Sequence, residues 1–190
     1  MKLEKRAYIG LGANLGNRIK NCIKALGLLS AYPEIEVSRC SQWYETEPVD
    51  INTSQWFINA VAEIITALGP EDLLSNLLAI EKAMGRDRLG TEDRPIDLDL
   101  LFMEGVRIQT SNHQITKSFN HQITKSPNHQ IQVPHPRLST RQFVLAPWAE
   151  LAPNLLLAPW SKTVSELLAE LPENSPEVRK LNHKETQEGY

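Results

Sequence analysis

The 190-residue sequence has little of what marks secreted or membrane-spanning proteins. It holds only two cysteines, Cys22 and Cys40, which cannot form a disulfide framework and do not have metal-ligand spacing. No apolar run approaches the roughly 18 residues of a membrane-spanning helix. Charged residues followed by glycines stand where a signal peptide would have its apolar core. We therefore expect a cytoplasmic protein with no membrane partner.

Positive charge is not in excess either. The 20 Lys and Arg residues are outnumbered by 23 Asp and Glu, which gives a net charge of -3. Without an overall positive field the protein has no general attraction for nucleic acid, so we expect no nucleic-acid partner. The two common glycine-rich phosphate motifs are also missing. Residues 10–16 read G-x-G-x-x-x-G, which is not the dinucleotide fingerprint, and no P-loop sequence occurs.

The sequence does contain enough apolar residues for the core of one domain. Hydrophobic residues make up 41% of the chain, and the length fits one domain of ordinary size. Hydrophobic periodicity predicts strand 7–12, a helix beginning after Asn17, strand 35–44, strand 57–64, helix 70–84, strand 96–102 with a hairpin to 106–108, and short helices near 141–151 and 163–171. This β-α-β-β-α-β order predicts an α+β, ferredoxin-like fold, in which helices pack on a mostly antiparallel sheet.

A short tandem repeat interrupts the second half of the chain. The segment 112–118 recurs after 8 residues and begins a third time. Its polar composition and short period predict a surface insert at about 110–131, with a histidine-rich metal tract as the alternative. We expect a single domain over residues 1–172 that carries this insert, followed by a charged and frayed tail over 173–190.

Asp97 and Asp99 form the most informative pattern. On a strand, alternation places these two carboxylates on one face, while Ile96, Leu98 and Leu100 share the other. Two carboxylates this close repel each other unless a cation lies between them, and a small set of hard oxygen ligands suits Mg²⁺ that also takes phosphate oxygens. The alternative is a strand whose solvent face happens to carry two aspartates.

Arginines lie close to this pair in the sequence. Arg86, Arg88 and Arg94 fall in one loop with Gly90, and guanidinium groups match the oxygens of phosphates. His135 lies between two prolines, in a stiff turn that can aim an imidazole at a phosphate. A solvated charged loop and a structural histidine are the alternatives.

Asn14 and Asn59 each lie at the edge of an apolar strand. A buried amide can read a heterocycle because it offers both a donor and an acceptor. The alternative is a core amide that is satisfied by the backbone.

Together these segments resemble one family. The resemblance rests on residues 7–16, 44–48, 57–61, 80–81 with 85–86, 94–102, 133–137 and 141–144, which fall in a diagnostic order. In this order they are similar to the 6-hydroxymethyl-7,8-dihydropterin pyrophosphokinases of folate biosynthesis. The resemblance covers roughly residues 6–155, apart from the repeat insert.

The resemblance implies transfer of the terminal pyrophosphoryl unit of ATP to the pterin hydroxymethyl oxygen, with release of AMP. It implies two Mg²⁺ ions held by Asp97 and Asp99, and catalytic roles for these two residues with Arg86 and Arg94. The nucleotide site would comprise Glu81, Arg86, Arg94, His135 and Arg141. The pterin pocket would comprise Thr46, Val49, Phe57, Asn59 and Phe143. ATP and a pterin are thus the expected partners of what we expect to be a monomer.

Two alternatives remain open at this point. One is a different Mg²⁺-dependent phosphoryl or nucleotidyl transferase that acts on another small alcohol, from which only the pterin pocket distinguishes the chain. The other is a catalytically silent binding module in which Asp97 and Asp99 are merely solvated.

Overall fold

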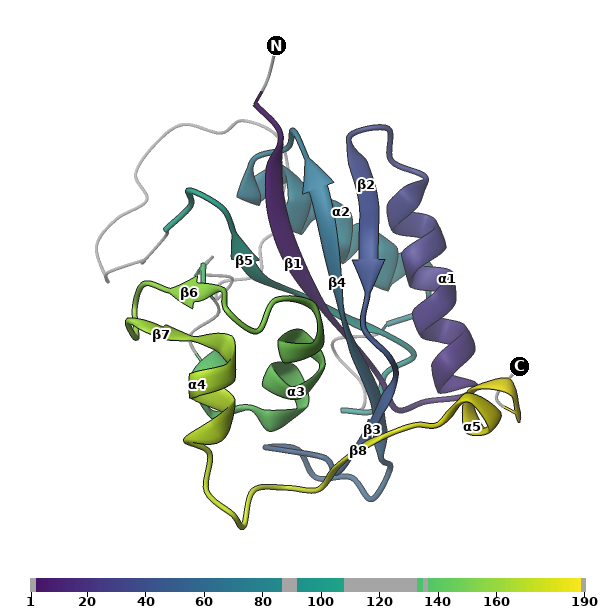
Figure 1. Ribbon diagram of the computed structural model, residues 1–190. Helices are drawn as coiled ribbons and strands as arrows, with labels where there is room; N and C mark the ends of the chain where they lie inside the picture. Colours follow the sequence, from purple (N-terminus) through teal and green to yellow (C-terminus); the bar gives the residue numbers. More distant parts are fainter. Residues whose placement is uncertain (1–2, 87–91, 108–132, 135–136, 189–190) are drawn as a thin grey trace.

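The computed structural model describes residues 3–86, 92–107, 133–134 and 137–188 (Figure 1). The elements are β1 (Lys5–Ala13), α1 (Arg18–Ser30), β2 (Ile35–Cys40), β3 (Tyr44–Thr46), β4 (Phe57–Thr66), α2 (Pro70–Ala83), β5 (Asp97–Met103), a short 3-10 helix (Leu138–Thr140), α3 (Gln142–Leu151), β6 (Leu156–Leu157), β7 (Lys162–Thr163), α4 (Val164–Ala169), β8 (Val178–Lys180) and α5 (His183–Glu188). The repeat insert and His135 lie outside the described residues, and so does Ile108, the predicted end of the hairpin.

One antiparallel sheet organises the chain. Its strand order is β5-β1-β4-β3-β8, and β2 pairs with a second stretch of β4. With β2 and β3 counted as one interrupted strand, this is the predicted ferredoxin-like order. Helices α1 and α2 lie on one face of the sheet, and α3 and α4 lie on the other (Figure 1).

The single strand predicted over residues 35–44 is wrong, because two short strands replace it. At the break, the Ser41 N–H donates to the Val61 carbonyl at 2.9 Å, while the Ser41 hydroxyl accepts from the Val61 N–H at 3.0 Å. A side-chain oxygen thus takes the place of a backbone carbonyl in the ladder. After the interruption, β3 pairs with the first residues of β4, which include Asn59.

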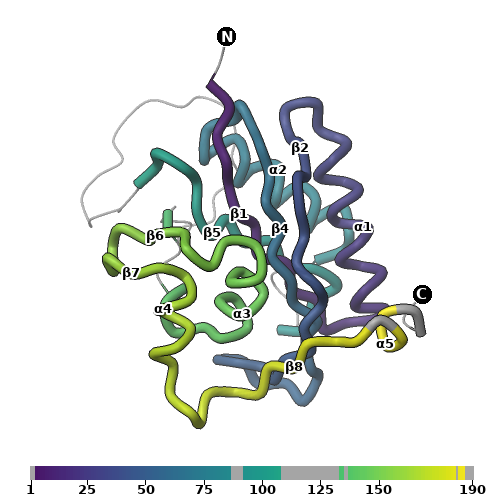
Figure 2. The backbone as a smooth tube through the Cα atoms, viewed as in Figure 1, coloured from purple at the N-terminus to yellow at the C-terminus, as the bar shows by residue number. Residues whose placement is uncertain are grey.

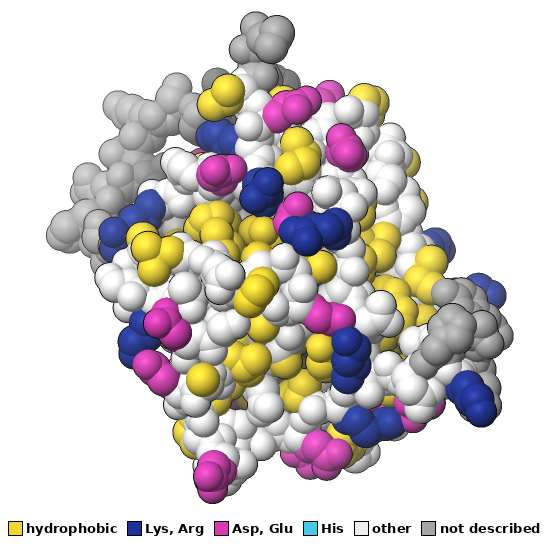
Figure 3. All heavy atoms as spheres, viewed as in Figure 1, with side chains coloured by type: hydrophobic (Ala, Val, Ile, Leu, Met, Phe, Trp, Pro, Cys, Tyr) yellow, Lys and Arg dark blue, Asp and Glu magenta, His cyan; other side chains and the backbone are white. Residues whose placement is uncertain are grey.

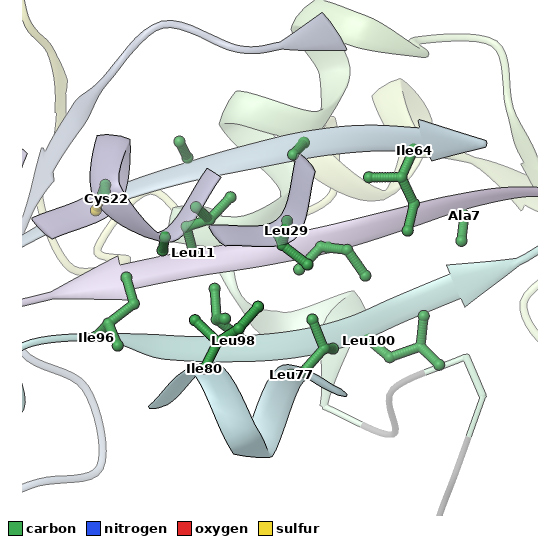
Figure 4. Packing of buried hydrophobic residues seen from close by; sticks show 14 of the residues in the cluster. Ala7, Leu11, Cys22, Leu29, Ile64, Leu77, Ile80, Ile96, Leu98 and Leu100 are labelled. Carbon is green, nitrogen blue, oxygen red and sulfur yellow. The ribbon is translucent and has the colours of Figure 1, made fainter. Parts of the chain in front are cut away.

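The larger core fills the space between the sheet and helices α1 and α2. Leu77 and Ile80 of α2 point toward Leu98 and Leu100 of β5 (Figure 4), and all four are buried. Both predicted helix starts are confirmed. The Asn17 side chain accepts from the Lys20 N–H at 3.0 Å at the start of α1, and Pro70 is the first residue of α2, where its missing N–H costs nothing.

A second core lies between the sheet and helices α3 and α4. Tyr8, Phe102 and Trp148 pack with ring centroids 5.2 to 6.3 Å apart. Val61 and Leu101 complete the sheet side of this core. The remainder of this face, toward the start of β4 and of β5, holds the cavity described below.

The C-terminal segment is not frayed, contrary to the expectation. Strand β8 pairs with β3, the Leu181 N–H donates to the Trp43 carbonyl at 2.9 Å, and the Leu181 side chain is buried. Figure 2 shows this segment running from α4 along the sheet to α5. The expectation failed because a charged composition does not reveal that backbone groups pair with a distant strand edge.

Charged side chains of both signs lie side by side on the face that Figure 3 shows. Ion pairs of the structure include Arg39 with Glu63 and Lys180 with Glu150. Within the described residues, none of the helices combines the length and the apolar character needed to cross a bilayer.

Candidate active site

A cavity of about 350 Å³ opens on the α3 side of the sheet. It is lined by residues of β1, β3, β4, β5 and α3 and of the loop after β3, among them Gly10, Gly12, Thr46, Val49, Asp50, Phe57, Asn59, Arg86, Arg94, Asp97, Asp99, Arg141 and Phe143. Of the residues expected in the metal, nucleotide and pterin sites, the structure gathers all in this cavity except Glu81, which lies behind Asp97, and His135. His135 and the loop residue Arg88 lie outside the described residues, and Asn14 lies away from the cavity.

The floor of the cavity is the backbone of β1. A Cβ atom on Gly12 would lie 2.8 Å from the Oδ1 of Asn59, closer than side-chain contacts permit. With glycine at position 12, β1 passes beneath the Asn59 amide without displacing it. On either side, Gly12 pairs with Asn59 of β4 and with Asp97 of β5, so the strand register brings these two side chains to one place.

Asp97 and Asp99 share the cavity face of β5, as their spacing predicts, and Leu98 and Leu100 face the larger core. The pKa of Asp99 is raised to about 6, first because the carboxylate is largely removed from solvent and second because the charge of Asp97 is close. A cation between the two groups would relieve this repulsion.

Arg86 and Arg94 flank Asp97. Arg86 donates to both Glu81 and Asp97. Burial by itself would lower the pKa of Arg86, but the charges of Asp97 and Glu81 outweigh it and raise the pKa. The Nε of Arg94 lies 3.1 Å from Asp97 Oδ2, and its guanidinium carbon lies 5.1 Å from the centre of the Phe57 ring.

Glu81 is buried at the end of α2 and contacts β5 from behind. Its Oε1 accepts from the Leu98 N–H at 2.8 Å as well as from Arg86. The carboxylate therefore fixes the backbone between the two aspartates and holds Arg86 beside them.

Asn14 resolves an alternative that the sequence left open. Its Oδ1 accepts from the Arg94 N–H at 2.7 Å, and its Nδ2 donates to Asp93 Oδ1 at 2.7 Å. The backbone N–H groups of Asn14 and Leu15 both donate to the Arg94 carbonyl, at 3.1 and 3.3 Å. This amide therefore ties the loop before β5 to β1, and Asn14 does not line the cavity.

Arg141 approaches from the start of α3, with its guanidinium carbon 5.3 Å from the centre of the Phe143 ring. Its pKa is lowered by burial and by the nearby charge of Arg137. The Oδ2 of Asp50 lies 3.1 Å from Nη1 of Arg137 and 3.9 Å from Nη2 of Arg141. Sequence reasoning missed Asp50, whose only signal was its place in the polar loop after β3. The buried Nε of Arg141 has no hydrogen-bond partner among the described residues.

Asn59 and Thr46 form the opposite wall. The Nδ2 of Asn59 donates to the Thr46 hydroxyl at 2.7 Å, and both residues are buried. This bond orients the Asn59 amide. The rings of Phe57 and Phe143 and the side chain of Val49 supply apolar surface to the same cavity.

The donor set suits Mg²⁺ bound together with a phosphate-containing substrate. Within the part of the chain that the structure describes, no cluster of three or more His, Cys, Asp and Glu side chains is placed to hold a metal ion. Two carboxylates without further protein ligands do not make a closed site. They match the way Mg²⁺ is usually held, by one or two carboxylates with waters and substrate phosphates.

The comparison that decides the family is a match over residues 8–153 to the model of 7,8-dihydro-6-hydroxymethylpterin-pyrophosphokinase (HPPK). The chain belongs to this family. The matched range includes every residue of the cavity described above. The family resemblance predicted from the sequence is thereby confirmed.

Relatives with the name 2-amino-4-hydroxy-6-hydroxymethyldihydropteridine pyrophosphokinase align over most of their length. The protein of Methylorubrum extorquens is 36% identical over 167 residues, which cover 87% of this chain and 93% of the relative. That of Bacillus subtilis is 36% identical over 146 residues, 76% of this chain and 77% of the relative. The mitochondrial folate synthesis bifunctional protein of Arabidopsis thaliana is 39% identical over 149 residues, 78% of this chain, and the chain spans only 24% of its length.

Solved structures share the fold. The HPPK-DHPS of Plasmodium falciparum superposes with a TM-score of 0.69 at 14% identity, over 89% of this chain and 46% of that one. The likeness therefore concerns one part of a longer protein.

Proposed function

We propose that this HPPK chain transfers the pyrophosphoryl group of ATP to the hydroxymethyl oxygen of 6-hydroxymethyl-7,8-dihydropterin, a step of folate synthesis. The observation that carries the proposal is the juxtaposition of an acid pair flanked by arginines with a cavity that an oriented asparagine and two aromatic rings line. The first group of residues suits a polyphosphate, and the second suits a planar heterocycle with donors and acceptors at its edge.

The reaction forms one bond and breaks one. The pterin oxygen attacks the β-phosphorus of ATP, the bond from that phosphorus to the oxygen bridging it to the α-phosphate breaks, and AMP leaves. The hydroxyl proton is released. Transfer of this kind depends on positioning and charge stabilisation more than on side-chain proton transfer.

Asp97 and Asp99 would hold Mg²⁺, and the resemblance implies two ions. When bound, the metal supplies charge neutralisation and orientation of the phosphate oxygens. Arg86 bonds to Glu81 and Asp97 through one nitrogen, Nη1, so ATP would accept from its other N–H groups. Arg94 and Arg141 would contact the phosphates from the two sides of the cavity, and His135 completes the proposed nucleotide site.

The pterin would lie against Asn59. The Asn59 Oδ1 does not take part in the bond to Thr46 and can accept from the amino group of the heterocycle. Phe57 and Phe143 would supply faces for stacking, and Val49 would close the edge. Both free cysteines agree with the proposed cytoplasmic location, and we propose that the protein is a monomer.

The nucleotide product tests this proposal. The protein is incubated with ATP, Mg²⁺ and the hydroxymethyl dihydropterin, and nucleotides are separated by anion exchange. We expect AMP in equal amount to the pterin diphosphate, and no AMP when the pterin is omitted. ADP as the product, or AMP that forms equally fast without the pterin, would contradict the proposal. Asn59→Ala serves as the variant in which pterin-dependent AMP formation falls while nucleotide binding persists.

A further inference from the structure

Strand β8 lies outside the part of the chain that matches the family, which ends at residue 153. It pairs with β3, which carries Thr46 and whose other edge pairs with Asn59 of β4. The strand order therefore places the C-terminal segment directly behind one wall of the proposed pterin pocket (Figure 1).

An ion-pair cluster ties β8 to this wall. Arg179 donates to Glu45 at 2.7 Å, and Arg18 of α1 donates to the other oxygen of Glu45 at 2.9 Å. Arg18 also donates to the carbonyl of Trp56 at 2.8 Å, the residue before Phe57. Burial would raise the pKa of Glu45, but its bonds to Arg179 and Arg18 outweigh burial and lower the pKa. The Glu45 carboxylate thus joins β8 to β3 and, through Arg18, to the residue that precedes β4.

A second contact continues into the loop after β3. The Glu47 N–H donates to the Glu177 carbonyl at 3.0 Å, and the Glu177 N–H donates to Glu47 Oε2 at 2.9 Å. Glu47 follows Thr46 and lies in the cavity wall. The loop that leads to Val49 is therefore held at its start by the C-terminal segment.

We propose that β8 positions the pterin-binding wall, with Arg179 as a positioning residue that acts through Glu45 on Thr46 and Asn59. The inference rests on the proposed function, because it assigns the pterin to this wall. The pairing of β8 adds a strand to β3, which has only three residues and would otherwise be a short edge strand. The ordered wall lets Thr46 hold the Asn59 amide before the substrate arrives.

The effect should fall on pterin binding and spare the phosphate chemistry. None of the contacts of Arg179 reaches Asp97, Asp99 or Arg141. Loosening of β3 therefore raises the KM for the pterin while the rate at saturating substrate stays near that of the parent.

Backbone alternation supplies a matched pair of proline variants. In an antiparallel pair, the N–H groups that face the partner recur at every second residue. The Leu181 N–H bonds to the Trp43 carbonyl and the Glu177 carbonyl accepts from Glu47, so the N–H of Arg179 faces β3 and that of Val178 faces away. Arg179→Pro removes a ladder donor together with the ion pair, while Val178→Pro leaves the ladder intact.

A second pair of variants tests the loss of the Arg179 side chain alone. Arg179→Ala removes the bonds to Glu45 and to Glu185 of α5 and keeps the backbone pairing. Arg39→Ala removes a similarly exposed arginine that bonds to Glu63 at 2.6 Å, on the same sheet but away from the cavity. Arg179→Lys keeps the charge near Glu45, so its KM for the pterin should be close to that of the parent.

Steady-state kinetics in the full chain test the inference. We expect the pterin KM to rise about threefold in Arg179→Ala, consistent with a partly exposed ion pair, and at least roughly tenfold in Arg179→Pro. The two control variants should stay within about twofold of the parent, and kcat should stay within about twofold in all four. Equal KM values in Arg179→Pro and Val178→Pro, or a fall in kcat as large as the rise in KM, would overturn the inference.

Amide exchange without substrates separates this inference from the proposed function. In Arg179→Pro the peptide that contains β3 should exchange at least roughly tenfold faster than in Val178→Pro, with β1 and β5 unchanged. Equal exchange of β3 in the two variants would refute the positioning role whatever the activity. Absence of pterin-dependent AMP formation in the parent would instead refute the proposed function.

Discussion

The side chain of Asn14 accepts a hydrogen bond from the Arg94 N–H at 2.7 Å, although the two residues are 80 positions apart in the sequence. Asn14 is at the end of β1 and is almost fully buried. Arg94 carries a guanidinium that lies beside Asp97 and over Phe57. Asn14 lies outside the cavity, yet it fixes the backbone position of Arg94, one of the arginines of the proposed nucleotide site.

Asn14→Ala should lower kcat strongly and reduce the unfolding free energy only moderately. The variant loses two buried side-chain hydrogen bonds, which we expect to cost about 2 kcal/mol of unfolding free energy. The backbone bonds from Asn14 and Leu15 to the Arg94 carbonyl remain. The loop therefore stays attached but less well aligned, and kcat should fall roughly tenfold. Steady-state kinetics and urea unfolding measure the two effects.

Asn17→Ala is the matched control for this variant. It removes the N-cap of α1, which should cost about 1 kcal/mol of stability and leave kcat unchanged, because Asn17 accepts from the N–H groups of Lys20 and Asn21 in the first turn of α1 and does not line the cavity. An Asn14→Ala variant that loses stability but keeps full kcat would show that the asparagine has no part in aligning Arg94.

Gly12→Ala should damage the pterin site. The new methyl group would lie 2.8 Å from the Asn59 Oδ1, so the Asn59 amide must move from its bond to Thr46. We expect the pterin KM to rise at least roughly tenfold, since each tenfold change corresponds to about 1.4 kcal/mol. Gly27→Ala is the control: nothing lies within 4 Å of its new methyl group, and alanine in α1 should stabilise the protein by about 0.5–1 kcal/mol. An unchanged KM in Gly12→Ala would exclude a tight contact between β1 and Asn59.

Glu63 should make stability depend on pH. Burial would raise its pKa, but hydrogen bonds from Arg39 and Tyr8 outweigh burial and lower the pKa; Tyr8 itself is held neutral, with its pKa raised to about 12. A carboxylate with a lowered pKa in the folded state stabilises the fold above the pKa of the unfolded chain, about 4.3, and loses this contribution as the pH falls further.

Glu63→Gln should therefore cost about 2 kcal/mol of unfolding free energy at pH 7, and progressively less below about pH 4.3. Urea unfolding of both proteins across this pH range provides the measurement. Glu36→Gln, an exposed change on β2, should stay within about 0.5 kcal/mol of the parent at every pH. A constant difference between parent and Glu63→Gln down to pH 3 would contradict the account of the ionised carboxylate.

Local signals predicted the parts of the fold that depend on neighbouring residues. The cap at Asn17, the proline that starts α2 and the alternation of Asp97 and Asp99 are all readable over a few positions, and the structure confirms them. The strand order could also be predicted, because the order of the elements along the chain restricts how the strands of a small sheet can be connected.

Contacts between distant segments could not be predicted in the same way. Arg179 and Glu45 are 134 residues apart, and nothing in the charged C-terminal sequence indicates which strand edge it pairs with. The sequence left open whether Asn14 reads a heterocycle or is a core amide; it is a buried amide that accepts from a backbone N–H, but no local signal indicated that its partners lie in the loop before β5. The roles of the site residues toward ATP, Mg²⁺ and the pterin remain predictions.

Substitutions of Asp97 and Asp99 should affect the stability of the protein differently, although both residues are expected to take part in the reaction. Asp97 pairs with Arg86 and Arg94, so Asp97→Asn leaves both arginines with weaker partners and should lower the thermal midpoint in chelator. No hydrogen bond or ion pair joins the Asp99 side chain to another of the described residues. Asp99→Asn relieves repulsion with Asp97 and should keep or raise the midpoint.

The most direct test of the account is AMP formation by Asp99→Asn at saturating Mg²⁺, ATP and pterin. Loss of one anionic ligand should withdraw about 4 kcal/mol of transition-state stabilisation, so the rate should fall roughly a thousandfold while the thermal midpoint in chelator is kept. Asp72→Asn, an exposed change in the first turn of α2, should retain full activity. Near-normal AMP formation by Asp99→Asn would contradict this mechanism and would leave the acid pair without a role in the reaction.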